Sequence, residues 1–284
     1  MHAHQACTSA TPKEHCPRHL AFEPCFAIFA LAVAGWSCEA HRLPTATPTS
    51  TSTDTAAVPW RSAPRPAQSA GSLRELPVAG FQSALLFVPG GTARRPLLVA
   101  AHGAGGDPQW DCDYWRRLTS DRAFVLCLRG TPLGGHYAGY FYRDHLALGR
   151  ELAAAERAAR TAEPRILAGS GVYAGFSQGA SMGAPIAYQH AGALPYVLLI
   201  EGFTPWNIPL ARRFLGAGGQ RVLWVCGSQA CGAVAKTSAH WLEVAGGQAR
   251  FEMVEGAGHT PAGPVMTRVE AALPWLLGAD PHWQ

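Results

Sequence analysis

The sequence predicts an α/β fold in which a mostly parallel central sheet carries helices on both faces. From about residue 73 onward, short apolar runs alternate with amphipathic segments, as strands and helices do in βαβ units. The run at 96–102, PLLVAAH, is apolar almost throughout, which is typical of a strand buried on both faces. Of the 284 residues, 48% are hydrophobic and 15% charged, as in ordinary globular chains.

The elements follow from the period of the apolar residues. Strands are expected where short apolar runs end at turn residues, namely at 82–89, 96–102, 123–129, 171–176, 196–200, 221–226 and 249–254. Helices are expected where apolar or alanine-rich positions recur at helical spacing, namely at 107–120, 145–162, 178–191, 210–215, 233–245 and 263–277. A loop rich in glycine and aromatic residues, 130–144, separates two of these elements.

The front of the chain is expected to lie outside this domain. The apolar run 25–36 is too short to span a bilayer but suits a signal peptide, and Ala-Val-Ala at 32–34 is a cleavage pattern. The segment ending at Cys38 resembles a degraded lipobox, so a lipid on Cys38 would anchor the protein to a membrane. We therefore expect a leader at 1–38, a disordered Thr/Ser/Pro/Ala-rich linker at 39–72 and one domain at 73–284, exported to the bacterial periplasm, cell surface or medium. The alternative is a misassigned start with a meaningless leader.

Charge and cysteines limit the function further. A net charge of +4, scattered along the chain, does not indicate a nucleic-acid-binding surface. None of the eight cysteines forms a CxxC pair, which argues against a zinc ribbon. In an oxidising compartment, Cys112 on a helix can pair with Cys127 on the next strand, and Cys226 with Cys231 across one turn. Buried free thiols are the alternative.

One pentapeptide predicts a nucleophile. Gly175-Phe176-Ser177-Gln178-Gly179 matches G-x-S-x-G and lies between a predicted strand and a helix, the context that this pattern requires. The sharp turn strains the backbone at Ser177 and exposes its hydroxyl, and the N–H of Gln178 then points toward a developing oxyanion. The alternative is a glycine-rich helix start with a serine that faces solvent.

Two further segments complete the predicted chemistry. The HGAGG turn at 102–106 can supply a second oxyanion N–H, from Ala104, while His102 is interpreted as orienting the turn. His259, in a glycine-rich loop beyond the last strand, is the predicted general base that takes the Ser177 proton and returns it to the leaving group. An ordinary glycine-rich turn and a solvated loop histidine are the alternatives.

GFSQGA, the HGAGG turn and the terminal GAGH together resemble the α/β-hydrolase superfamily, in particular small carboxylesterases and acyl-thioesterases, over about residues 82–277. The resemblance implies a Ser-acid-His hydrolase with no cofactor or metal.

The acid departs from the family's pattern. The turn at 226–231 that usually carries it has Ala230 where aspartate would fall, and no aspartate lies between Ser177 and His259. The remaining acids there are Glu201, Glu243, Glu252 and Glu255. Some α/β-hydrolases carry the acid after the strand that follows the nucleophile, which favours Glu201 as the group that holds the imidazole. The alternatives are a strand-end glutamate that caps a helix or pairs with an arginine, and a Ser-His dyad without an acid.

Substrate contacts are expected from aromatic residues near the strand ends. Tyr137 and Tyr140 of the 130–144 loop, with Trp110 and Trp206, are predicted to line an apolar pocket, although core packing is an alternative for the loop. No large lid insertion follows residue 202, so small or medium esters are expected as substrates of a monomeric enzyme. A peptidase or polyester depolymerase on the same triad, or an inactive surface-anchored binding protein, are the competing functions.

Overall fold

A computed structural model describes residues 71–136 and 138–284. The predicted leader, the linker up to residue 70, Cys38 and Tyr137 lie outside the described residues. Within the described part, no helix is both long enough and apolar enough to cross a membrane.

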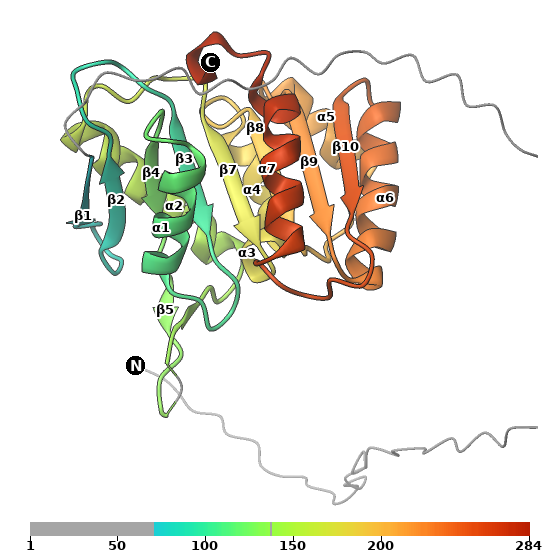
Figure 1. Ribbon diagram of the computed structural model, residues 1–284, viewed down its shortest axis with the longest axis horizontal. Helices are drawn as coiled ribbons and strands as arrows, with labels where there is room; N and C mark the ends of the chain where they lie inside the picture. The colour runs from blue at the N-terminus through green and yellow to red at the C-terminus, as the bar shows by residue number, and fades with distance from the viewer. Residues whose placement is uncertain (1–70, 137) are drawn as a thin grey trace, which may run out of the picture. The chain divides into compact units, whose positions relative to one another are not determined.

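An eight-stranded sheet forms the centre of the domain, in the order β1-β2-β4-β3-β7-β8-β9-β10 (Figure 1). The strands are β1 (Ser72–Leu76), β2 (Ala84–Val88), β3 (Leu97–Ala101), β4 (Phe124–Cys127), β7 (Val172–Phe176), β8 (Tyr196–Ile200), β9 (Arg221–Cys226) and β10 (Gln248–Met253). Strand β2 runs antiparallel to both β1 and β4, and all other neighbours are parallel. The predicted mostly parallel sheet is therefore confirmed.

Helices cover both faces, as predicted. They are α1 (Pro108–Leu118), α2 (His145–Ala162), α3 (Gln178–Ser181), α4 (Gly183–His190), α5 (Ile208–Gly216), α6 (Gln229–Val244), α7 (Pro264–Leu277) and the 3₁₀ turn η1 (Pro281–Trp283). Helices α1 and α7 pack on one face with Leu98 and Ala100, while α2 to α6 pack on the other with Leu97 and Val99 (Figure 1). Successive residues of β3 thus enter different cores, which is why this run carries no polar position.

The structure differs from the predicted elements in four places. Helix α6 begins at Gln229, four residues before the predicted start at 233. Strand β1 was not predicted and begins at Ser72. The predicted helix 178–191 is divided at Met182 into α3 and α4. The aromatic loop contains a small hairpin of β5 (Thr131–Pro132) and β6 (Tyr140–Phe141).

Both predicted disulfides are present in the structure. Cys112–Cys127 joins α1 to β4 with Cα atoms 5.8 Å apart, and Cys226–Cys231 joins the end of β9 to the first turn of α6 with Cα atoms 5.6 Å apart. The second one closes a turn at the carboxyl edge of the sheet, where ligands bind in open parallel sheets.

Candidate active site

Ser177 occupies a strained turn between β7 and α3. Its backbone has φ 49° and ψ −105°, a conformation that side chains rarely adopt. The flanking glycines make this turn possible: a Cβ on Gly175 would lie 2.7 Å from the backbone nitrogen of Ala180, and one on Gly179 would collide with the carbonyl of Ala101. The serine side chain is therefore presented at the carboxyl end of the strand, as the sequence predicted.

The structure brings Ser177, His259 and Glu201 into one hydrogen-bonded line. His259 Nε2 lies 2.9 Å from Ser177 Oγ, and His259 Nδ1 lies 3.0 Å from Glu201 Oε2. The loop that carries His259 bends at Gly256 and Gly258, whose φ angles of 73° and 74° favour glycine. With the imidazole proton on Nδ1, His259 donates to the carboxylate and accepts the serine proton at Nε2.

Glu201 is fully buried and lies directly after β8. Its Oε1 accepts hydrogen bonds from the backbone N–H of Gly227 and, at 3.0 Å, of Ser228, and its Oε2 accepts the Ser228 hydroxyl at 2.6 Å. A buried carboxylate is costly unless it is paired and hydrogen-bonded, and here three donors of the turn join His259 in satisfying it. The turn that lacks the usual aspartate thus supplies the donors that hold the acid in place.

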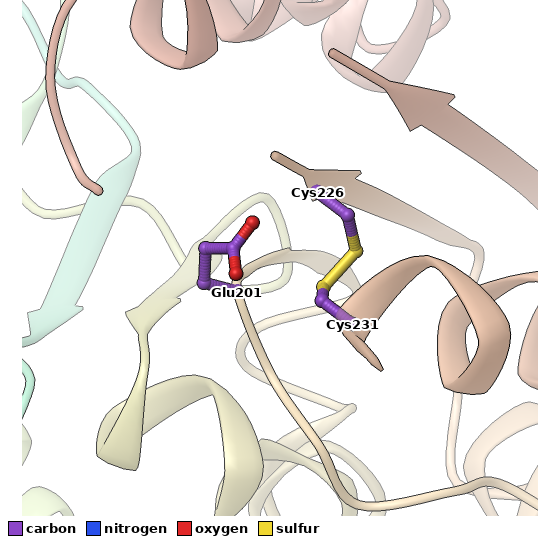
Figure 2. Close-up of side chains that lie close together, drawn as sticks. All are labelled: Glu201, Cys226 and Cys231. Carbon is purple, nitrogen blue, oxygen red and sulfur yellow. A yellow bond between two sulfur atoms is a disulfide. The ribbon is translucent and has the colours of Figure 1, made fainter. Parts of the chain in front are cut away.

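The Cys226–Cys231 disulfide brackets this same turn, and Figure 2 shows it beside the carboxylate of Glu201. Within the described residues, Glu201 and these two sulfurs are the one group of potential metal ligands, with ligand atoms within 4.8 Å of one another. The two sulfurs are bonded to each other, so neither is a free thiolate for a metal.

The other acids between Ser177 and His259 are engaged elsewhere. Glu255 accepts a hydrogen bond from Gln229 at 2.8 Å, Glu252 pairs with Arg250 and Arg268, and Glu243 is exposed on α6. Among these glutamates, Glu201 alone contacts the imidazole.

The two N–H groups predicted to stabilise an oxyanion have no hydrogen-bond partner among the described residues. Within the described residues, neither the N–H of Gln178 nor that of Ala104 donates a hydrogen bond, whereas the following N–H groups do: Gly105 donates to Tyr140 and Gly179 to His102. The HGAGG turn lies against the nucleophile, because a Cβ on Gly103 would be 3.0 Å from Ser177 Cβ.

His102 fixes the same turn. It is buried, with Nδ1 2.7 Å from the carbonyl oxygen of Gly103 and Nε2 2.9 Å from that of Arg129, and its ring stacks on Tyr142. Burial lowers the pKa of His102 below its usual value, so the ring is neutral at neutral pH. His102 thus contacts the backbone of its own turn, the carbonyl of Arg129 and the ring of Tyr142, which agrees with its interpretation as a residue that orients the turn.

Two phenylalanines flank the imidazole of His259. Ring centroids of Phe176 and Phe203 lie 5.3 Å and 5.4 Å from that of His259, and Phe203 is 41% exposed. The backbone N–H of Phe203 donates to Ser181 Oγ at 3.0 Å, which ties the β8–α5 loop to the helix after the nucleophile. Phe203 was not among the predicted site residues, and its only signal in the sequence is its place two residues after Glu201.

An open cleft of about 510 Å³ lies beside the nucleophile. Its lining residues are His102, Gly103, Ala104, Gly105, Gly106, Asp107, Trp110, Asp111, Phe176 and Pro261. Trp110 lines the cleft as predicted and is 48% exposed. Tyr140 is not among the lining residues; its hydroxyl lies 3.3 Å from the Arg129 guanidinium.

The prediction that Trp206 contacts substrate is wrong. Its side chain is 1% exposed and packs edge-on against Phe214 of α5 and Trp224 of β9, with ring centroids 5.4 Å and 5.5 Å away. Trp206 belongs to the same buried cluster as Val197 of β8 and Ala211 of α5, so the indole lies in the core instead of the cleft.

Comparison with known proteins identifies the fold. No family model and no curated protein matches the chain. Among solved structures, the dienelactone hydrolase-like promiscuous phosphotriesterase P91 from metagenomic libraries is 17% identical, with a TM-score of 0.59 over 74% of this chain and 99% of that one. An esterase of Pyrobaculum calidifontis is 15% identical (TM-score 0.53, 75% of this chain and 86% of that one), and a carboxylesterase of Bacillus cereus is 23% identical (TM-score 0.50, 71% and 95%). The chain therefore has the α/β-hydrolase fold, as its resemblance to small carboxylesterases implied.

Proposed function

We propose that the protein is a serine hydrolase that cleaves carboxylic esters through an acyl-serine intermediate. The observation that carries this proposal is the hydrogen-bonded line from Glu201 through His259 to Ser177, next to two uncommitted backbone N–H groups. The shared fold with esterases and carboxylesterases supports a hydrolase, although fold alone does not assign a substrate.

Acylation begins when Ser177 Oγ attacks the ester carbonyl. His259 Nε2 takes the hydroxyl proton, and the negative charge that develops on the carbonyl oxygen is stabilised by the N–H groups of Gln178 and Ala104. His259 then returns the proton to the leaving alcohol as the tetrahedral intermediate collapses to the acyl-enzyme.

Deacylation repeats these steps with water. His259 removes a proton from the attacking water, and the same N–H groups stabilise the second oxyanion. When the bond to Ser177 Oγ breaks, the proton returns to the serine and the carboxylic acid leaves. Throughout, Glu201 holds the Nδ1 proton of His259 and stabilises the imidazolium that forms.

The size of the site favours small or medium acyl groups. The cleft is open, and within the described residues only the segment 201–207 connects β8 to α5, so no inserted domain covers the nucleophile. A long acyl chain would extend into solvent and gain little from additional methylene groups.

A fluorophosphonate probe tests the proposal. The probe should label the folded wild-type protein and fail to label the Ser177→Ala variant or heat-denatured protein. A series of p-nitrophenyl esters from acetate to palmitate, with p-nitroanilides of the same acids, then measures chain-length preference and separates esterase from peptidase activity. A folded protein that neither reacts with the probe nor turns over any ester would instead be a catalytically inactive binding protein.

We also propose that the protein is exported, which the two disulfides support because such bonds persist in oxidising compartments. The intact mass of the protein from a bacterial host distinguishes three outcomes: cleavage after the leader, a lipidated Cys38, or a retained N-terminus. The last outcome would contradict export.

A further inference from the structure

A buried acid lies in the cleft beside the nucleophile and has no part in the mechanism above. Asp111 of α1 is 6% exposed, and no hydrogen bond or ion pair from any described residue reaches its carboxyl group. It lines the cleft together with Ala104 and Phe176. The carboxyl group is therefore largely enclosed by the protein, lies at the wall of the proposed substrate site, and has no partner among the described residues.

The scaffold does not account for this residue. The N-cap of α1 is Asp107, whose side chain accepts the Gln109 N–H at 2.9 Å, so Asp111 is not needed to cap the helix. A buried polar group without a partner costs free energy, and such groups cluster at functional sites. A partner supplied by a ligand would remove this cost.

Around Asp111, aromatic side chains and the glycine-rich turn at 102–106 line the cleft, and no arginine or lysine is among them. Trp110 and Phe176 line the cleft, and a narrow inner pocket that also contains Asp111 adds Tyr114 and Trp115. None of the described residues that line either space is an arginine or a lysine, whereas Asp107 adds a second carboxylate to the cleft. Aromatic faces beside a carboxylate attract cations, because the negative face of a π-system and the anion act together.

We infer that the cleft selects esters that carry a positively charged ammonium group, which Asp111 would pair with while Trp110 covers it. This inference rests on the proposed function, because it names the substrate class of that same site. The connection is direct: Phe176 precedes Ser177 and lines the cleft, and Ala104 both lines the cleft and carries the proposed oxyanion N–H. When the carbonyl of an ester is bound at Ser177, either its acyl group or its alcohol group is thus expected to lie beside Asp111.

Electrostatics agrees with this placement. Burial, and secondarily the charge of Asp107, raises the pKa of Asp111 to about 7. Among the described residues, Tyr142 and Tyr173 also interact with Asp111, and Tyr114 lines the inner pocket with it; burial raises the pKa of all three tyrosines, so they stay neutral. His102, which lines the cleft, is also neutral at neutral pH because burial lowers its pKa. A bound cation would stabilise the ionised form of Asp111, and binding should strengthen as the pH rises through about 7.

The test compares esters that differ only in charge. Acetylcholine and 3,3-dimethylbutyl acetate form a pair with the charge on the alcohol, and the phenyl esters of 4-trimethylammoniobutyrate and 5,5-dimethylhexanoate form a pair with the charge on the acyl group. A quaternary ammonium keeps its charge at every pH, so any pH dependence of the ratio belongs to the protein. For at least one pair we expect kcat/KM to be roughly tenfold higher for the cationic ester at pH 8, and the ratio to fall toward one below pH 6.

Three variants assign the preference. Asp111→Asn should bring the ratio close to one at every pH, and Trp110→Ala should reduce it in part. Asp113→Asn is the matched control from the same helix: its carboxylate contacts Gln109 and Arg116 outside the cleft, so the ratio should not change. Thermal melting confirms that each variant is folded.

The outcomes separate the two proposals. If the neutral esters are cleaved but neither cationic ester is preferred, or if Asp111→Asn retains the preference, the inference is wrong and the ester hydrolase remains. If wild type cleaves no ester at all, the proposed function fails. Calorimetric titration with phenyltrimethylammonium then still decides whether the cleft binds a cation in an Asp111-dependent way, and no binding overturns the inference.

Discussion

Replacing Glu201 by glutamine tests the most specific element of the proposed site. The carboxylate accepts hydrogen bonds from Gly227, Ser228 and the Nδ1–H of His259. Glutamine has nearly the same shape, but one of its two terminal groups is an NH₂, which only donates. If the amide oxygen stays with the backbone N–H groups of the turn, the NH₂ faces His259 Nδ1.

The consequence is a change of tautomer. An NH₂ opposite Nδ1 favours the imidazole with its proton on Nε2, and that nitrogen then cannot accept the proton of Ser177, which lies 2.9 Å away. The imidazolium formed during acylation also loses its counter-charge. We expect kcat for p-nitrophenyl butyrate to fall by about 10³- to 10⁴-fold, the range typical when the triad acid is converted to its amide.

The assay is steady-state hydrolysis from pH 6 to 9, together with the rate of labelling by a fluorophosphonate. Glu255→Gln is the matched control, since that carboxylate contacts Gln229 and not the imidazole, and its activity should remain within about twofold of wild type. A folded Glu201→Gln variant that retains more than about a tenth of the wild-type kcat would refute the assignment, as would equal losses in both variants, and a Ser-His dyad would then be preferred.

Three further predictions follow from contacts around the site. Phe203→Ala removes the ring that stacks on His259 and should lower kcat by about three- to tenfold with little change in melting temperature. Phe203→Tyr keeps an aromatic ring at this position and should have a kcat close to that of the wild type. An alanine variant with unchanged kcat would show that the stacking is incidental. Replacing Cys226 and Cys231 together by alanine should cost about 2 kcal/mol of unfolding free energy and also lower kcat, because the disulfide closes the turn that holds the acid. Loss of the other disulfide should lower stability without changing kcat, and equal effects on kcat would contradict this role of the turn. The native state raises the pKa of Asp111 from 3.8 to about 7. Between these two pH values the folded protein binds more protons than the unfolded chain, so the free energy of unfolding of the wild type decreases as the pH rises. The free energy of unfolding of Asp111→Asn, measured by urea unfolding, should therefore increase relative to that of the wild type from pH 4 to pH 8, by at most about 4 kcal/mol. If the difference between the two proteins stays constant with pH, the carboxyl group of Asp111 titrates normally.

The sequence was most informative where local geometry restricts residue type. A strained serine between a strand and a helix needs small neighbours, so Gly175 and Gly179 made the turn at Ser177 recognisable from the residue pattern alone. The segment between the nucleophile and His259 contains no aspartate but four glutamates, and Glu201 was favoured because it follows the strand next to the nucleophile, where some α/β-hydrolases carry the acid. Its burial and its donors could not be predicted, because they depend on β9 lying beside β8.

The errors and omissions share a different cause. A residue after a strand end can turn toward the cleft or into the core, and the sequence does not say which: Trp206 lies in the core, whereas Trp110 lines the cleft. Asp111 did carry a signal that was overlooked: it occupies the same helical face as the buried Trp115, four residues later, where an acid is unexpected. An acid within an apolar stripe is thus worth the same attention as a recognised motif.

In the proposed triad, the turn at 226–231 holds the acid without carrying it. Wherever the acid is placed, His259 needs a carboxylate oxygen at Nδ1, and a buried carboxylate needs further donors. With the acid at Glu201, the turn after β9 supplies those donors through Gly227 and Ser228, and an aspartate there would instead bring a second negative charge against the first. Ala230 in the turn and Glu201 after the neighbouring strand thus fit together, because the turn donates hydrogen bonds to the carboxylate instead of carrying one. The absence of an aspartate from this turn is therefore compatible with the proposed triad, in which Glu201 supplies the carboxylate.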